Sequence, residues 1–259
     1  MSRVAWSATL TACLMPAGDL PAAKEHPLSV AERASLSRQF EETVSRLTKQ
    51  LQDAPKRVDH YSARGDAYFF GGRFAEAVAD YEKMVALQPD LEAAHWRRGI
   101  AYFFAGRFPD AARQFEIYHT HDDVDRENGI WRYFSQVKAY GAEKAQAGLL
   151  KYEKDDREPF PVIYRLFARS ATPTEVFAQI RAAQVSTEER EKRLFYAQLY
   201  VGLNDGVVGN RTGAVEHLRE AVRNSWAPRA AYGPRFMWHV GRLEYERLSA
   251  AEKPSTNTN

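Results

Sequence analysis

The sequence predicts an all-α fold, a solenoid of helix-turn-helix repeats with a further helix at each end. The main observation is a block of eight residues, Ala67–Phe74, that recurs almost unchanged after 34 positions as Ala101–Phe108. A fixed period of this length indicates helical hairpins that each bury one face against the next. In addition, no segment alternates apolar and polar residues with period two, so we expect almost no strand.

The composition limits the classes of function. Of the 259 residues, 44% are hydrophobic and 27% are charged, which is ordinary for a globular protein with a sizeable core. The net charge of +2 comes from interspersed acidic and basic residues and gives no drive toward nucleic acid. The one cysteine, Cys13, excludes a disulfide framework and a cysteine-based zinc site in the folded body.

Residues 1–28 are predicted to hold a lipoprotein signal followed by a tether. Leu10–Cys13 has the pattern of a bacterial lipoprotein processing site, which makes Cys13 the candidate for lipidation, and three prolines follow in residues 14–28. The preceding apolar stretch, Val4–Leu10, is only seven residues long, which is short for a secretory signal. The alternative is a disordered amino-terminal tail with a chance cysteine on a cytoplasmic protein.

Residues 29–55 are predicted to form a capping helix. Ser29 and Glu32 make a capping-box pair at its start. One apolar stripe follows at helical spacing, formed by Leu36, Phe40, Val44, Leu47 and Leu51. This stripe either covers the end of the first repeat, which is the simpler interpretation, or pairs with a second copy of itself in a homodimer.

Residues 56–126 contain two regular repeats with the signature of the tetratricopeptide (TPR) repeat. The glycines at 65 and 99 leave room for the second helix of each hairpin, and those at 72 and 106 end the first helix in a left-handed turn. The tyrosines at 68 and 102 are expected between the two helices. The signature residues are Gly65, Tyr68, Gly72, Ala77, Tyr81 and Pro89, then Gly99, Tyr102, Gly106, Ala111 and Phe115.

The pattern weakens over residues 127–193 and then returns. A degenerate third repeat is expected as a helix ending at Gly141 and a second helix over 142–152, followed by a linker over 153–161 and a helical insert. A late repeat and a carboxy-terminal capping helix over 234–248 are predicted within 194–250, and residues 251–259 form a disordered tail. The late repeat is recognised by Gly202, Gly209 and Ala214.

The chain shows no phosphate-binding loop and no hydrolase motif, so we predict no catalytic residues and no cofactor. The most metal-like stretch is His119–Asp125, with two imidazoles and three carboxylates. It lies where one repeat meets the next, and such a connector is usually a solvated polar loop. A metal-dependent enzyme built on this stretch is the remaining alternative from another functional class. His239 is interpreted as a packed core residue.

The concave surface of the two regular repeats is the candidate partner-binding groove. In this repeat class the first helix of each pair lines that surface. The repeat register places there Ser62, Asp66, Phe69 and Phe70, then Trp96, Ile100, Phe103 and Phe104. A groove lined by aromatic side chains would take an apolar or amphipathic segment of another protein. Alternatively, some of these phenylalanines face the neighbouring helix.

Over residues 30–248 the chain resembles the bacterial lipoprotein NlpI family. The likeness lies in the order of a capping helix, two regular repeats, a degenerate pair opened by Trp131 and Tyr133, a helical insert and a late repeat. Members of that family are homodimeric outer-membrane adaptors without catalytic residues, which bring a periplasmic protease to cell-wall hydrolases. The resemblance therefore implies an envelope-tethered scaffold that faces the periplasm.

Overall fold

The computed structural model describes residues 25–250, and these are entirely helical apart from turns and connecting segments. Cys13 and the tail over 251–259 lie outside the described residues. The helices are α1 (Val30–Asp53), α2 (Val58–Phe70), α3 (Phe74–Leu87), η1 (Pro89–Leu91), α4 (Trp96–Phe104), α5 (Phe108–His121), α6 (Arg126–Tyr140), α7 (Ala142–Ala147), α8 (Phe160–Phe167), α9 (Pro173–Ala182), α10 (Thr187–Val208), α11 (Arg211–Arg223), η2 (Ala227–Arg229) and α12 (Tyr232–Ala250).

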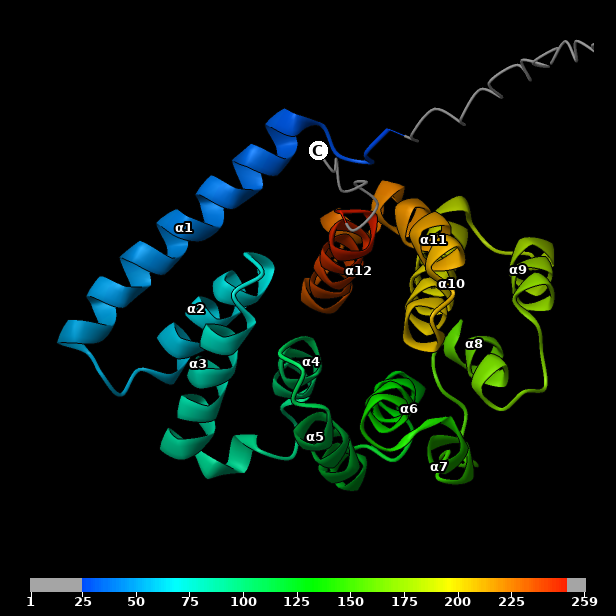
Figure 1. The fold of residues 1–259 in the computed structure, drawn as a ribbon, viewed down its shortest axis with the longest axis horizontal. Coiled ribbons are helices and arrows are strands. Elements are labelled where there is room, and N and C mark those ends of the chain that lie inside the picture. The colour runs from blue at the N-terminus through cyan, green and yellow to red at the C-terminus, as the bar shows by residue number, and fades with distance from the viewer. Residues whose placement is uncertain (1–24, 251–259) are drawn as a thin grey trace, which may run out of the picture.

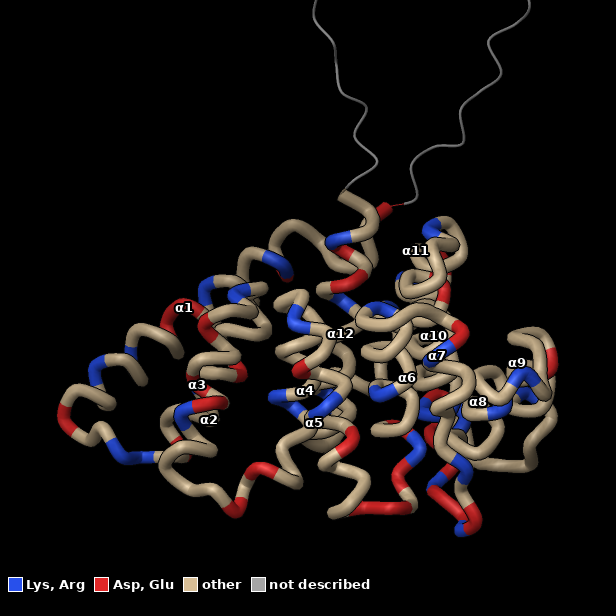
Figure 2. Tube along the Cα trace, turned by 60° about the horizontal axis from the view of Figure 1, so that its bottom comes forward, with Lys and Arg blue, Asp and Glu red and all other residues tan. Residues whose placement is uncertain are grey.

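The helices pack in sequential pairs, as expected for a TPR array, and the array curves until its two ends meet. Neighbouring helices contact one another in chain order from α1 through α6, and α10, α11 and α12 pack in the same way. Helix α12 also returns to contact α2 (Figure 1). The inner face of the curve is formed by α2, α4, α6, α10 and α12. Acidic and basic residues alternate over the outer helices without a single-sign stripe (Figure 2).

Helix α1 begins and ends where its sequence predicts. The Ser29 side chain accepts the Glu32 backbone N–H, and the Glu32 side chain accepts the Ser29 N–H, so both halves of the capping box are present. Of the apolar stripe, Val44, Leu47 and Leu51 are buried. Helix α1 packs on α2 and so covers the end of the first repeat.

The turn glycines of the regular repeats have the left-handed backbone that the sequence pattern requires. Gly72 and Gly106 have φ of +77° and +76°, and Gly209 of the late repeat has φ of +87°. Ala77, Ala111 and Ala214 are each fully buried within their hairpins. Tyr68 is half-buried, packs against the core and lies under the guanidinium of Arg73, which precedes α3.

The degenerate third repeat differs from the sequence prediction in its second helix. Helix α7 ends at Ala147 rather than continuing to Tyr152, and residues 148–159 form no helix. Tyr152 instead lies against Gly129 of α6, and its hydroxyl donates to the Asp125 carbonyl at 3.1 Å. The stretch predicted as a linker, 153–161, also contacts α6, because the Asp156 side chain accepts the Arg126 backbone N–H at 2.9 Å.

Helix α12 does more than cover the far end of the late repeat. It packs on α10 and α11, and it also lies against the inner face of α2. Phe236 stacks on Phe69 with ring centroids 4.9 Å apart, and the Tyr232 hydroxyl donates to Asp66 at 2.6 Å.

Within the part of the chain that the structure describes, no helix is both long and apolar enough to cross a membrane.

Candidate functional site

The eight residues predicted to line the concave groove are on α2 and α4, and α12 packs against four of them, Asp66, Phe69, Phe70 and Trp96. Phe69 and Ile100 are 0% and 1% exposed, and the other six are half-buried. Phe70 stacks on His239 of α12 at 4.1 Å, and Trp96 meets Phe236 edge-on at 4.9 Å. The repeat pattern indicated which face is concave, but it carried no information on what packs there.

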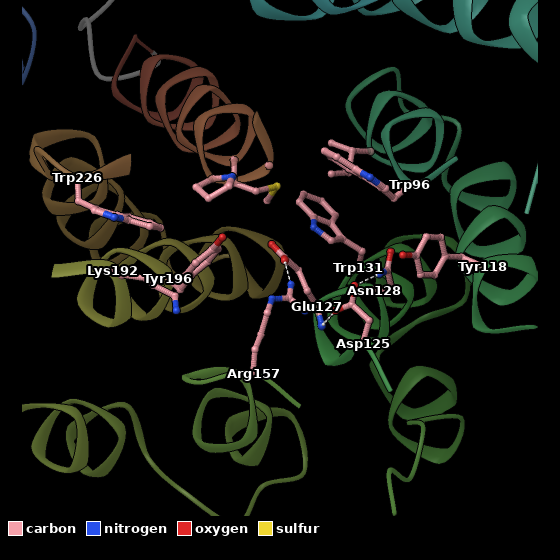
Figure 3. Close-up of a pocket in the computed structure, with 14 residues that line it drawn as sticks. Trp96, Tyr118, Asp125, Glu127, Asn128, Trp131, Arg157, Lys192, Tyr196 and Trp226 are labelled. Atoms are coloured by element: carbon pink, nitrogen blue, oxygen red, sulfur yellow. Dashed lines mark hydrogen bonds and ion pairs between the residues drawn. The ribbon is translucent and has the colours of Figure 1, made fainter. Parts of the chain in front are cut away.

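A cavity of about 440 Å³ remains on the inner face, between α4, α6, α10 and α12 (Figure 3). This volume is in the range of sites that hold a small molecule or a side chain of a partner. Two of the predicted groove residues, Trp96 and Ile100, line it. The remaining lining residues are Tyr118, Asp125, Glu127, Asn128, Trp131, Arg157, Lys192, Tyr196, Trp226, Gly233, Pro234 and Met237.

The start of α6 positions the acidic side of the cavity. Asp125 is the N-cap of this helix, and its side chain accepts the backbone N–H of Glu127 at 2.9 Å and the side-chain amide of Asn128 at 2.5 Å. Such capping satisfies backbone donors that the first helical turn leaves unpaired. It also fixes Glu127 in the first turn, with its carboxylate on the cavity wall and directed toward Arg157 (Figure 3).

Arg157 holds these carboxylates together from the segment that follows α7. Its guanidinium donates to Glu127 at 2.5 Å, to Asp125 at 3.1 Å and to Asp156 at 3.3 Å. The guanidinium carbon also lies 4.3 Å from the centre of the Phe160 ring, which favours a cation–π contact. Arg157 is thereby fixed in place by a ring on one side and acids on the other.

Burial dominates the electrostatics of this cluster. It raises the pKa of Glu127 to about 7, because loss of water outweighs the attraction of Arg157. The pKa of Asp125 is also raised, again by burial first. The hydroxyl of Tyr200 on α10 donates a hydrogen bond to the Glu127 carboxylate. Burial, together with this carboxylate, raises the pKa of Tyr200 well above its usual value.

The cavity wall combines aromatic rings, carboxylates and two cationic side chains. Among the described residues that line the cavity, none is Ser, Thr, Cys or His. Five of the lining residues are aromatic, and two, Glu127 and Asp125, carry carboxylates. The cavity therefore offers aromatic surface and hydrogen-bond acceptors to an entering group.

The side chains of the stretch His119–Asp125 contact different partners and do not converge on one point. Asp123 pairs with Lys154 at 2.8 Å, Asp125 caps α6, and the His119 ring meets Tyr152 edge-on. Over residues 25–250, no three His, Cys, Asp or Glu side chains are arranged to hold a metal ion. The one part of this stretch that reaches the cavity is Asp125.

Sequence reasoning missed the residues that give the cavity its charge. Glu127 received no role, and Asp156 was placed in a free linker, although its side chain is 4% exposed and accepts the Arg126 N–H at 2.9 Å. The available signal was the N-cap pattern at Asp125, which marks the helix start and places Glu127 in its first turn. No local sequence pattern predicts that Arg157 pairs with Glu127, which lies 30 positions earlier in the chain.

Comparison with known proteins identifies the repeat class. Residues 65–106 match the family model described as TPR repeat, and this range spans most of the first hairpin and the first helix of the second. A search of curated proteins gave no match. The chain therefore contains a TPR repeat within an all-helical array. Proteins with this repeat are usually non-catalytic scaffolds for other proteins, and no enzyme family was found. The comparisons give no support to the NlpI family in particular.

Proposed function

We propose that the protein is a non-enzymatic scaffold that holds a segment of a partner protein in the cavity between α4, α6, α10 and α12. The observation that carries this proposal is an aromatic-lined cavity on the inner face of a TPR array, where α12 already occupies the neighbouring groove. Interface hot spots favour Trp and Tyr side chains, and the cavity offers the half-buried Trp96 and Trp226 and the buried Tyr196.

The proposed location is the cell envelope, with the chain tethered by a lipid on Cys13. The processing pattern over Leu10–Cys13 and the likeness in helix order to the NlpI family support this proposal. On that basis the partners are a periplasmic protease and cell-wall hydrolases, and the protein acts as a homodimer. A cytoplasmic scaffold is the alternative if Cys13 carries no lipid.

Substitution of Trp96 tests the cavity as the partner site. Trp96→Ala removes a large aromatic surface from the cavity wall, and loss of such an anchor typically costs about 2 kcal/mol or more of binding free energy. We expect the partner that co-purifies with the unmodified chain to be lost. Val208→Ala is the control, because Val208 is 56% exposed and lies outside the cavity. Equal capture by both variants, with unchanged thermal unfolding, would place the partner site elsewhere.

Metabolic labelling with a fatty-acid analogue tests the location separately. We expect label that depends on Cys13 and that fractionates with membranes, whereas Cys13→Ala remains unlabelled. An unlabelled chain with an intact amino terminus would leave the scaffold proposal standing and move the partner search to the cytoplasm.

A further inference from the structure

The cavity carries more negative than positive charge at its acidic side. Three carboxylates, Asp125, Glu127 and Asp156, surround the single guanidinium of Arg157 at 2.5–3.3 Å. Arg126, next to this cluster in sequence, directs its guanidinium to the Lys154 carbonyl at 2.8 Å rather than to an acid. Arg157 is thus the one cation bonded to these three acids, and two of the acids, Asp125 and Glu127, line the open space. Above about pH 7, where Glu127 is ionised, three carboxylates surround this single guanidinium.

The two cations that line the cavity are already paired. Arg157 is bonded to the three acids, and Lys192 donates to Glu189 at 3.1 Å. An anionic ligand would therefore have to displace an existing ion pair and approach Glu127. A cationic ligand would instead meet the carboxylates of Glu127 and Asp125, whose oxygens accept bonds from Tyr200, Arg157 and Asn128 and can each accept one more, together with aromatic walls that attract cations.

Trp131 lies beside the acidic side of the cavity. Its side chain is 1% exposed and lines the cavity, and Tyr200, which it neighbours, donates its hydroxyl hydrogen bond to Glu127. The indole ring therefore adds aromatic surface next to the carboxylates, where a cationic group gains a cation–π contact.

We propose that the cavity recognises a lysine or arginine side chain of the partner protein, flanked by apolar residues. The cationic head lies against Glu127 and Asp125, and the apolar neighbours contact Trp96, Tyr196 and Trp226. This inference deepens the proposed scaffold function, because it names the chemistry that the cavity selects.

Titration with short blocked peptides tests the inference. The probes are acetyl-Leu-Lys-Leu-amide and acetyl-Leu-Arg-Leu-amide, with the Gln and Glu peptides of the same frame as neutral and acidic counterparts. Binding is measured by calorimetry and by the NMR signals of the tryptophan indole N–H groups. We expect the cationic peptides to bind about tenfold more tightly than the Gln peptide, and the Glu peptide to bind most weakly.

Glu127→Gln should abolish the preference for cationic over neutral peptides, while Glu143→Gln, an exposed position on α7, should keep it. Equal binding of all four peptides to the unmodified chain, or a preference retained by Glu127→Gln, would overturn the inference. The small aromatic amine 2-phenylethylamine tests the source of the cation. If it binds and the peptides do not, the cavity takes a free amine, and the proposal of a partner's lysine or arginine side chain is wrong. If Glu127→Gln does not fold, the peptide series on the unmodified chain still decides. If Trp96→Ala loses partner capture but the unmodified chain shows no preference for cationic peptides, the scaffold proposal stands and the cation inference is wrong.

Discussion

The ring of Tyr81 lies over Gly65 so closely that a Cβ atom on this glycine would be 2.7 Å from Tyr81 Cε1. The two residues are 16 positions apart and join α2 to α3. The same relationship recurs at the same spacing in the pairs Gly99–Phe115 and Gly202–Leu218, at 2.6 and 2.8 Å. One contact therefore sets the approach of both helices in each regular hairpin.

Replacement of Gly65 tests this contact. Gly65→Ala forces the Tyr81 ring out of its place, and overpacking of this kind costs about 1–3 kcal/mol of unfolding free energy. Gly233→Ala is the control, because a Cβ there would meet nothing within 4 Å and the helical position favours alanine. Urea denaturation should show a lower midpoint for the first variant and an unchanged or higher midpoint for the second. Equal midpoints would contradict the tight contact.

The parts of the fold that sequence reasoning predicted well depend on local patterns. The capping box at Ser29 and Glu32 marks the start of α1, where both of its hydrogen bonds are present. The repeat period locates the regular hairpins, because glycine, turn and small residue recur at fixed spacing within about 34 positions. In such segments, helix spacing and side-chain packing follow from neighbours along the chain.

The cavity could not be predicted in this way, because its parts come together only through the curvature of the whole array. Asp66 and Tyr232 are 166 positions apart and meet only because α12 returns to α2. The early end of α7 was missed for a similar reason. Ala and Lys in residues 142–152 favour helix locally, but the contact of Tyr152 with Gly129 draws the chain away.

The closure of the array at Tyr232 can be tested by removing one hydroxyl. This hydroxyl donates to Asp66 at 2.6 Å and accepts from Arg97 at 2.9 Å, so Tyr232→Phe leaves both charged groups with one partner fewer. We expect a loss of about 1.5–3 kcal/mol in unfolding free energy, the range for hydrogen bonds to charged groups. Amide hydrogen exchange should become faster at the start of α12.

Tyr140→Phe is the matched control for this change, because Tyr140 is 46% exposed on α6 and its ring lies 4.4 Å from the Lys144 ammonium. Its unfolding free energy should stay within about 0.5 kcal/mol of the unmodified chain. If exchange at α12 rises equally in both variants, the hydroxyl of Tyr232 does not hold the array closed.

The raised pKa of Glu127 predicts how stability depends on pH. The pKa of Glu127 is about 7 in the folded state, against 4.5 in a model peptide. Between these two pH values the folded state therefore retains a proton that the unfolded state has lost. The free energy of unfolding therefore falls as pH rises through this window, by about 1–3 kcal/mol from this group. Glu127→Gln cannot ionise and should lack that part of the decline. Urea denaturation at pH 5 and pH 8 should show the unmodified chain losing stability relative to Glu127→Gln at the higher pH. A constant difference between the two chains would mean that Arg157 keeps Glu127 ionised throughout.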